Sequence, residues 1–385
     1  MDNTPAAFSS LRTSSDFLDP DRHNLARRTL AAGLSLVSAA NRRVEYTIRG
    51  ADYRVAGVDR EKLGDLIEVT SSPRYNLFED LYADVITDLL ADRPDLVGIS
   101  ILNRQQIIPG LTLARRCREA GLVVVLGGTV YAKFHDQLTE RVLFFDTFCD
   151  GLVPYEGETA MRALAETIEN GRNPTQWGAI PNLLSVNANG DVVSGPTYAE
   201  DIRRLPTPDF DGLPLDAYLN PVRVLPILTG KGCYFNRCKF CDIPYINRIT
   251  KPYRVREPQQ IATDIATLHR RYGARHFEIT DETLSPKLLT RVADALDDHP
   301  DIHPRFVGYA RFEPGFTQEA CQRIYEMGVR KLFFGLESGN QEMLNNMNKG
   351  IHVDVAHRVL RNCAEAGIGV HVFSIVGFPE ESEVQ

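Results

Sequence analysis

The stretch VLPILTGKGCYFNRCKFCDIPY (224–245) decides the fold of the second half of this chain. The apolar run RVLPILTG (223–230), in which it starts, is typical of a buried strand. The strand continues directly into a loop that carries Cys233, Cys238 and Cys241. A strand that ends in a chemically reactive loop is the unit with which parallel α/β folds build their sites.

The same strand–helix unit repeats from this point to the end of the sequence. Apolar runs that predict further strands occur at 276–282, 305–314, 331–338 and 370–381, with amphipathic helical patterns between them. These five βα repeats deliver every strand's carboxyl end to one face, as in a partial TIM-like barrel with its site there. Because the sequence ends at Gln385, where the next helix should begin, we expect an incomplete barrel.

The first half of the chain shows a related alternation. Helical patterns at 22–41, 81–95, 109–121 and 158–171 accompany apolar runs at 96–102 and 122–129, and 142–153 reads as a short strand. Strands that are apolar on both faces favour a parallel, doubly wound, Rossmann-like sheet. Two apolar runs around Asn189-Gly190 predict a β-hairpin within a proline-rich linker. We therefore predict an α/β protein with domains at 1–170 and 221–385 and a linker at 171–220.

Composition excludes several classes of protein. The formal net charge is −8, and Lys and Arg are scattered rather than striped, so we expect no nucleic-acid partner. No apolar run approaches the length of a membrane span, and the first thirty residues lack the apolar core of a secretory signal. We expect a cytoplasmic protein without membrane contact, in which residues 1–20 form a loose, polar lead-in.

The seven cysteines fall into two groups. Cys117, Cys149, Cys321 and Cys363 stand alone in helix-like or strand-like segments and are expected to be buried apolar residues. The other three are crowded into nine residues in a C-x4-C-x2-C pattern. Three thiolates on one loop can hold three irons of a cubane cluster and leave the fourth iron open to a small molecule. The alternative is a zinc loop completed by a distant Cys or His.

Residues of about 222–385 resemble the radical S-adenosylmethionine (SAM) superfamily. Phe240 occupies the aromatic position of the family's C-x3-C-x-aromatic-C loop, although one extra residue separates Cys233 from Cys238. The fifth strand, SIVGFPEES, resembles the family's G-x-I-x-G-x-x-x-E segment, with Phe373 in place of the first glycine. The resemblance implies a [4Fe–4S] cluster on the three cysteines and SAM bound at successive strand ends.

The implied SAM contacts follow the strands in order. Asp281 and Glu282 would meet the SAM ammonium, although capping of the following helix is an equal alternative. Arg311 would pair with the SAM carboxylate, or else form a surface salt bridge. The remaining contacts implied by the resemblance are Phe240, Glu337 and Ser338 near the ribose, Ile375 and Gly377.

The first half resembles the cobalamin-binding domain that precedes the barrel in one radical SAM class. The matching segments are DLVGISILNRQQ (95–106), VVVLGGT (123–129) and DGLVPYEGET (150–159). The resemblance implies cobalamin contacts at the ends of these strands: Ser100, Asn103, Gly127, Gly128, Glu156, Gly157 and Glu158. The D-x-H-x-x-G signature is absent, which implies cobalt without a histidine ligand. The alternative is a flavodoxin-like domain with no ligand.

The resemblance implies that the reduced cluster cleaves SAM to a 5′-deoxyadenosyl radical, which abstracts hydrogen from a substrate. Three hypotheses compete. The first is a cobalamin-dependent C-methyltransferase acting on an unactivated carbon. The second is a radical SAM cyclase, oxidase or rearrangement enzyme with a non-methylating or vestigial cobalamin domain, and the third is a non-enzymatic metal- or cobalamin-binding module. The expected partners are a small-molecule or peptide substrate and an electron donor such as flavodoxin or ferredoxin.

Overall fold

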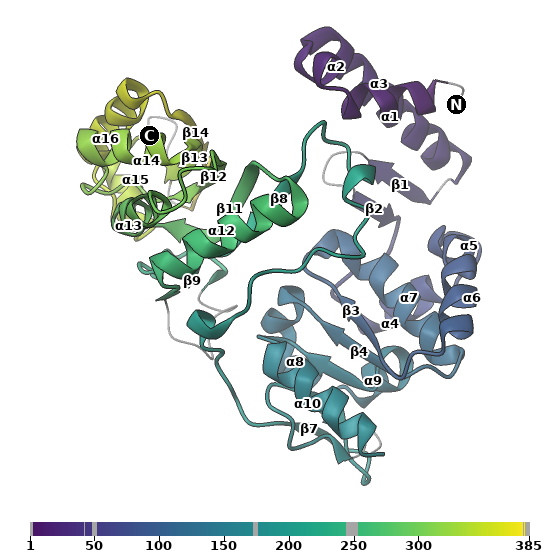
Figure 1. Ribbon diagram of the computed structural model, residues 1–385. Helices are drawn as coiled ribbons and strands as arrows, with labels where there is room; N and C mark the ends of the chain where they lie inside the picture. The colour runs from purple at the N-terminus through teal and green to yellow at the C-terminus, as the bar shows by residue number, and fades with distance from the viewer. Residues whose placement is uncertain are drawn as a thin grey trace. The chain divides into compact units, whose positions relative to one another are not determined.

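The computed structural model describes residues 3–41, 43–47, 52–171, 176–243, 253–379 and 381. The chain divides into two compact units (Figure 1). The N-terminal unit comprises residues 1–9 and 20–200, and the C-terminal unit comprises residues 10–19 and 201–385. Each unit has its own hydrophobic core and is described by itself.

A five-stranded sheet forms the centre of the N-terminal unit, in the order β3-β4-β5-β6-β7. Its strands are β3 (Val97–Ser100), β4 (Val124–Gly127), β5 (Gly151–Val153), β6 (Leu184–Val186) and β7 (Val192–Ser194). The first three strands run parallel, as the sequence predicts. The hairpin around Asn189-Gly190 is confirmed as β6–β7, and β6 pairs antiparallel with β5, so the hairpin extends this sheet.

Helices cover both faces of this sheet. Val124 and Leu126 of β4 belong to one core cluster, whereas Val125 between them belongs to another. The first cluster includes residues of α4 (Leu63–Thr70), α7 (Ile107–Glu119) and α9 (Val142–Phe148), and the second includes residues of α10 (Glu158–Glu169). Alternate residues of a parallel strand therefore enter two different cores.

Three N-terminal segments differ from the sequence-based expectations. Residues 142–148 form α9 rather than the first part of a strand, because Phe144, Phe145 and Phe148 pack at helical spacing into the core. The lead-in contains α1 (Thr4–Arg12) and α2 (Ser14–Leu18). Between residues 52 and 80, where the sequence shows no regular pattern, the structure contains β2 (Asp52–Val55) and α4; β2 pairs with β1 (Val44–Thr47), the strand that the stretch RVEYTI (43–48) predicts. Short elements carry too few turns or alternations for periodicity to show them.

The remaining elements of the N-terminal unit are helical. They are α3 (Pro20–Ala40), α5 (Phe78–Leu81), α6 (Ala83–Asp92) and α8 (His135–Leu138), with 3-10 turns η2 (Arg104–Gln106) and η3 (Thr129–Phe134). The helices predicted at 22–41 and 81–95 correspond to α3 and α6.

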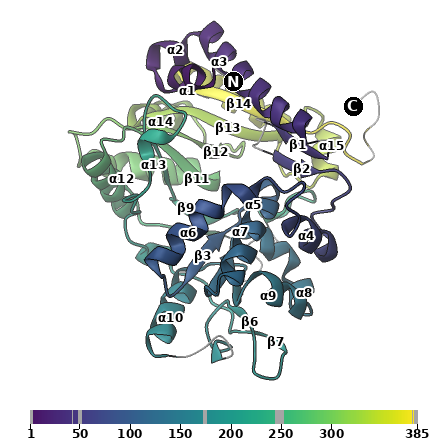
Figure 2. The ribbon, with the colours of Figure 1, turned by 90° about the vertical axis from the view of Figure 1, so that its right-hand side faces the viewer.

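The C-terminal unit is built on a five-stranded parallel sheet in the order β14-β13-β12-β11-β8. Its strands are β8 (Val224–Ile227), β11 (His276–Leu284), β12 (Arg305–Ala310), β13 (Val329–Glu337) and β14 (Gly369–Ser374). Figure 2 shows β11 to β14 side by side. All five predicted strands are confirmed, and each strand after β8 pairs with the strand that precedes it in the repeat.

The helices of this unit pack into one core with the sheet. They are α12 (Pro258–Tyr272), α13 (Pro286–Leu296), α14 (Gln318–Met327), α15 (Gln341–Asn346) and α16 (Val353–Ala366). Consecutive right-handed crossovers in one direction place their helices on one face of the sheet. Phe277, Phe306 and Phe334 point into this helical core and are at most 1% exposed. The four isolated cysteines are buried, as predicted.

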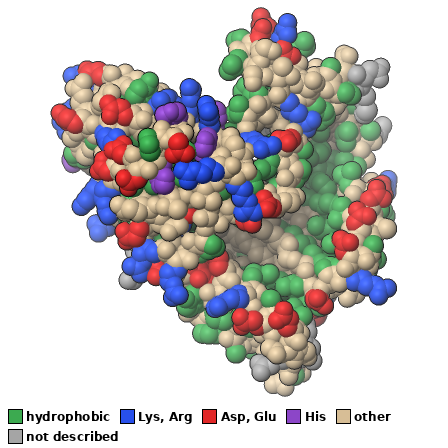
Figure 3. All heavy atoms as spheres, in the orientation of Figure 1, with side chains coloured by type: hydrophobic (Ala, Val, Ile, Leu, Met, Phe, Trp, Pro, Cys, Tyr) green, Lys and Arg blue, Asp and Glu red, His purple; other side chains and the backbone are tan. Residues whose placement is uncertain are grey.

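The surface and the helices agree with an ordinary globular composition. On the face drawn in Figure 3, Lys and Arg side chains lie among Asp and Glu side chains over both units. Within the described part of the chain, none of the helices combines the length and the apolar character that crossing a bilayer requires.

Candidate functional site

The three-cysteine loop leaves the carboxyl end of β8. It first forms a short antiparallel pair, β9 (Gly230–Gly232) with β10 (Tyr253–Val255). Cys233, Cys238 and Cys241 are all half-buried free thiols. Burial raises the pKa of Cys238 and of Cys241, and negative charge on Cys233 raises both further, so the thiols interact electrostatically. Pro244 and Tyr245, at the end of the quoted stretch, lie outside the described residues.

Three cysteine thiols on one loop make up the candidate donor set. Among the residues that the structure describes, no three His, Cys, Asp or Glu side chains surround a single ion position. The thiol donors belong to the ligand type that iron–sulfur clusters use, and such clusters carry their irons on several separate thiolates. The residues present therefore fit a cluster of this kind.

Two carboxylates from β11 hold the beginning of the loop. Asp281 accepts hydrogen bonds from the backbone N–H of Thr229 (2.7 Å) and from its hydroxyl (2.6 Å). Glu282 accepts the N–H of Gly232 at 2.8 Å. Capping of the next helix by these carboxylates is wrong, because Ser285 caps α13 by accepting the N–H of Leu288. Contact of the two carboxylates with the SAM ammonium stays a prediction.

Arg311 lies beside the loop and is only 8% exposed. Its guanidinium carbon lies 3.8 Å from the ring centroid of Phe235, within the loop, and its Nη2 donates to the carbonyl oxygen of Lys349. The alternative of a surface salt bridge is therefore wrong, because this arginine is buried and stacked on an aromatic ring. The positive charges of Lys349 and Arg311 lower the pKa of Cys238, opposing the larger effect of burial.

The segment 347–350, which we call the clamp, lies more than a hundred residues downstream and holds the other side of the loop. The N–H of Lys239 donates to the carbonyl of Met347 (3.0 Å), and the Asn348 amide donates to the carbonyl of Arg237 (2.9 Å). Sequence reasoning missed this segment. The available signal was the Asn348-Lys349-Gly350 run after a helix, since Asn348 and Gly350 both adopt positive φ, 52° and 63°.

Lys349 also forms a buried ion pair with Glu337, one of the predicted ribose contacts. Its Nζ lies 2.8 Å from Oε1 of Glu337 and 5.4 Å from the ring centroid of Phe240. The backbone carbonyl of Glu337 accepts the N–H of Ile375 at 2.8 Å. The structure thus brings Phe240, Glu337 and Ile375 together around the clamp, although these residues come from three separate segments.

The other predicted SAM residues lie in turns next to these contacts. Ser338 follows Glu337, and its hydroxyl accepts the N–H of Asn340 at 3.1 Å. Gly377 has a φ of 82°, and its N–H and that of Phe378 both donate to the Glu381 carboxylate. The turn after the fifth strand is therefore closed by the last residue of the recognised motif.

The residues expected to contact cobalamin lie at the carboxyl ends of β3, β4 and β5. Ser100 ends β3, and Asn103 caps the following turn by accepting the N–H of Gln105. Gly127 ends β4, and Gly128 has a φ of 115°; a Cβ there would lie 2.1 Å from the carbonyl oxygen of Ile101. Chain packing by itself therefore requires glycine at 128.

The turn after β5 is held by Asn182 and Glu200, two residues that the sequence analysis did not identify. Glu156 is buried and accepts the N–H of Glu200 at 2.7 Å, while the amide of Asn182 donates to the Glu156 carbonyl. Glu200 in turn accepts the N–H of Thr159 (2.7 Å). Gly157 is the N-cap residue of α10, which begins at Glu158. No local pattern links residues 156 and 200, which meet only in the folded unit.

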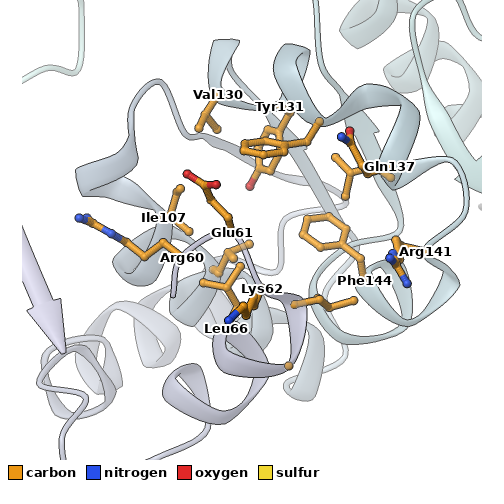
Figure 4. Close-up of a pocket in the computed structure, with 15 residues that line it drawn as sticks. Arg60, Glu61, Lys62, Leu66, Ile107, Val130, Tyr131, Gln137, Arg141 and Phe144 are labelled. Atoms are coloured by element: carbon orange, nitrogen blue, oxygen red, sulfur yellow. The ribbon is translucent and has the colours of Figure 1, made fainter. Parts of the chain in front are cut away.

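A pocket of about 590 Å³ lies next to these strand ends in the N-terminal unit (Figure 4). Its walls come from the beginning of α4, the beginning of α7 and the segment 130–144. Apolar side chains such as Leu66, Ile107 and Phe144 line it, and charged side chains such as Arg60 and Arg141 border it. The hydroxyl of Tyr131 is buried there and has no hydrogen-bond partner among the described residues.

Comparisons with known proteins agree with this geometry. Residues 227–385 match the family model described as the radical SAM superfamily. An uncharacterized methyltransferase of Pyrococcus horikoshii is 26% identical over 314 residues, which cover 80% of this chain and 65% of that protein. The anaerobic magnesium-protoporphyrin IX monomethyl ester cyclase of Rubrivivax gelatinosus is 25% identical over 322 residues, covering 80% and 55%. The chain thus spans less than two thirds of either relative.

Two solved structures share the fold. TsrM from Kitasatospora setae, described as a radical S-adenosylmethionine methyltransferase, matches with a TM-score of 0.65 and 22% identity over 80% of this chain and 61% of that chain. The cobalamin-dependent S-adenosylmethionine radical enzyme OxsB matches with a TM-score of 0.61 and 21% identity over 76% and 42%. The cysteine loop at the carboxyl edge of the parallel sheet lies within residues 227–385, the part of this chain that is similar to the radical SAM superfamily.

Proposed function

We propose that this protein is a radical SAM enzyme that holds a [4Fe–4S] cluster on Cys233, Cys238 and Cys241. The observation that carries this proposal is the set of half-buried thiols on one loop, with the positive charges of Lys349 and Arg311 beside it. Cluster potentials depend on nearby charge and on hydrogen bonds to sulfur. When bound, the cluster supplies one electron to SAM, whose S–C5′ bond breaks to give a 5′-deoxyadenosyl radical.

The chain's own residues would position SAM against this loop. Asp281 and Glu282 fix the backbone at residues 229–232, so the thiols start from a defined point. The guanidinium of Arg311 is charged and buried, which suits the SAM carboxylate. Glu337 and Ser338 lie at the end of β13, next to the clamp, where ribose hydroxyls would be held.

We further propose that the N-terminal unit binds cobalamin and that the reaction is C-methylation of an unactivated carbon. The carboxyl ends of parallel strands are where open α/β sheets bind ligands. Ser100 and Asn103 are exposed there, and the turn after β5 is held rigidly by Glu200. Bound cobalamin would carry the methyl group. The name of the Pyrococcus relative supports methyl transfer.

A second candidate is a radical cyclisation, oxidation or rearrangement without methyl transfer, which the name of the Rubrivivax cyclase supports. For either reaction we propose a small-molecule or peptide substrate and an electron donor such as flavodoxin or ferredoxin.

All seven cysteines are free thiols, which fits the reducing cytoplasm.

Metal analysis of anaerobically reconstituted protein tests the cluster. We expect iron and sulfide in equal amounts, and 5′-deoxyadenosine formation from SAM with dithionite. Cys238→Ala should lose both, whereas Cys321→Ala, a buried cysteine in α14, should retain both. Bound zinc without iron, or SAM cleavage retained by Cys238→Ala, would contradict the assignment.

Labelled SAM separates the two candidate reactions. Retained cobalamin absorbance together with transfer of the labelled methyl group supports methylation. Formation of deoxyadenosine from SAM and consumption of a substrate, without transfer of the methyl group, support the second candidate.

A further inference from the structure

Three aromatic side chains form a cluster on the face of the C-terminal sheet that points away from the helices. Tyr309 of β12, Phe333 of β13 and Phe373 of β14 make up this cluster, which we call the aromatic wall. The ring centroids of Tyr309 and Phe333 are 5.1 Å apart, and that of Phe373 lies 6.0 Å from Phe333 and 6.2 Å from Tyr309. Tyr309 and Phe333 are direct partners in the strand register.

The wall differs from the aromatic residues of the core in both exposure and orientation. Tyr309 and Phe373 are 39% and 40% exposed, although Phe306 and Phe334, on the other face of the same strands, are 1% and 0% exposed. The three rings of the wall are nearly parallel, with interplanar angles of 25°, 19° and 10°. A planar π-system can join such a set in the same orientation by offset stacking.

The position of the wall connects it with the proposed radical site. Tyr309 precedes Arg311 by two residues at the end of β12, and Phe373 precedes Ile375 by two residues at the end of β14. Ile375 in turn bonds to Glu337 beside the clamp. The wall therefore lies within the strands, next to the carboxyl edge of the sheet that carries the cysteine loop. Phe373 is also the residue that departs from the family's fifth-strand glycine.

Hydrogen-bond donors border the wall. The Nζ atom of Lys331 lies 4.7 Å from the ring centroid of Phe333. The His371 ring lies 5.4 Å from that of Phe333 and 4.9 Å from that of Phe373. An ammonium and an imidazole at the border of an apolar surface suit an acidic substituent on an otherwise apolar ligand.

We propose that the aromatic wall binds the substrate, and that the substrate is a planar conjugated molecule carrying at least one carboxylate. The proposal rests on the proposed radical SAM function, because the wall is the apolar surface next to the cluster loop. Stacking on the wall fixes the plane of the substrate, and Lys331 fixes its acidic end. A substrate held this way presents one of its edges to the carboxyl ends of the strands.

Binding of 2-naphthoate to the 385-residue protein, followed by NMR, tests the wall without any turnover. We expect the saturated analogue decahydro-2-naphthoate, which cannot stack, to bind about tenfold more weakly. Phe373→Leu should weaken 2-naphthoate binding by a similar factor. Val372→Ala is the matched control, because the Val372 side chain is exposed on the other face of β14 and should leave binding unchanged.

The charge requirement is tested separately with Lys331→Met. This variant should bind 2-naphthoate more weakly than the wild type does, but should bind the uncharged 2-naphthalenemethanol equally well. Equal binding of 2-naphthoate by the wild type and Phe373→Leu, equal binding of the flat and saturated acids, or no binding to the wild type would overturn the proposal. Deoxyadenosine formation by the wild type with dithionite is measured in parallel, so failure of the wall and failure of the cluster chemistry are distinguished.

Discussion

Asp281 is joined to Thr229 by two hydrogen bonds, one from the backbone N–H at 2.7 Å and one from the hydroxyl at 2.6 Å. Asp281 lies on β11 and Thr229 directly follows β8, so the contact ties the carboxyl ends of two adjacent strands. Because the cysteine loop departs from residue 229 onward, this contact sets where the loop begins. Asp281 is therefore a positioning residue for the proposed cluster site.

The free energy of unfolding should depend on pH through Asp281. Burial raises the pKa of its carboxyl from 3.8 to about 7, despite the hydrogen bonds from Thr229 and Gly230. Between these values this carboxyl binds more protons in the folded protein than in the unfolded chain, so its contribution to stability is fully present below about pH 4 and is lost as the pH rises through 7. Urea denaturation from pH 4 to 8 measures this contribution.

The matched variants for this test are Asp281→Asn and Asp298→Asn. Asp281→Asn should flatten the profile of stability against pH, because no titrating group remains at the buried position. Asp298 is exposed, so the same change there should leave the profile as it is in the wild type. Identical profiles for Asp281→Asn and the wild type would show that this carboxyl does not titrate differently on folding.

Breaking the Lys349–Glu337 pair should be costly. Both side chains are about nine-tenths buried, with exposed fractions of 11% and 10%. Lys349→Met leaves the Glu337 carboxylate buried without its partner, and we expect a loss of about 3 kcal/mol in the free energy of unfolding. Adding Glu337→Gln to Lys349→Met should restore part of this loss, because no buried charge remains.

An exposed pair provides the control for the Lys349 experiment. Lys62 and Asp59 lie 3.7 Å apart, but their side chains are 71% and 44% exposed. Lys62→Met should change stability by less than about 1 kcal/mol. A loss for Lys349→Met as small as that for Lys62→Met would contradict the structural role of the clamp.

Gly350 should not tolerate a side chain. Its φ is 63°, and a Cβ there would lie 2.6 Å from the Phe235 ring. Gly350→Ala should therefore cost roughly 1–2 kcal/mol from backbone strain, with a further loss from displacement of Phe235, and should reduce iron loading. Gly339→Ala is the control, since nothing lies within 4 Å of a Cβ at that position. Equal thermal midpoints and iron contents for both variants would disprove the tight contact.

Tyr131→Phe should leave the N-terminal unit as stable as before, or stabilise it by about 1 kcal/mol. The Tyr131 side chain is 5% exposed, its hydroxyl lacks a partner among the described residues, and burial raises its pKa. Removing a buried hydroxyl that makes no hydrogen bond removes its desolvation cost. A clear loss of stability in urea denaturation would mean that the hydroxyl has a partner, such as a ligand in the pocket.

The sequence by itself determined the repeating elements of the C-terminal unit and the identity of its reactive loop. Buried parallel strands are continuous apolar runs, and amphipathic helices carry their own period, so β8, β11, β12, β13 and β14 were all predictable. The C-x4-C-x2-C loop was equally local, because its thiols lie within nine residues. Where a helix is rich in aromatic residues, as in VLFFDTF (142–148), composition indicated a strand and only core packing decided otherwise.

Tertiary structure alone decided which groups hold the loop and which face of the sheet is open. The bonds from Met347 and Asn348 to the loop join segments more than a hundred residues apart, and no local pattern specifies such a contact. Likewise, Tyr309, Phe333 and Phe373 become one surface only because neighbouring strands pair in register and the helices cover the opposite face. Periodicity describes one segment at a time, whereas a site consists of side chains from several segments brought together by packing.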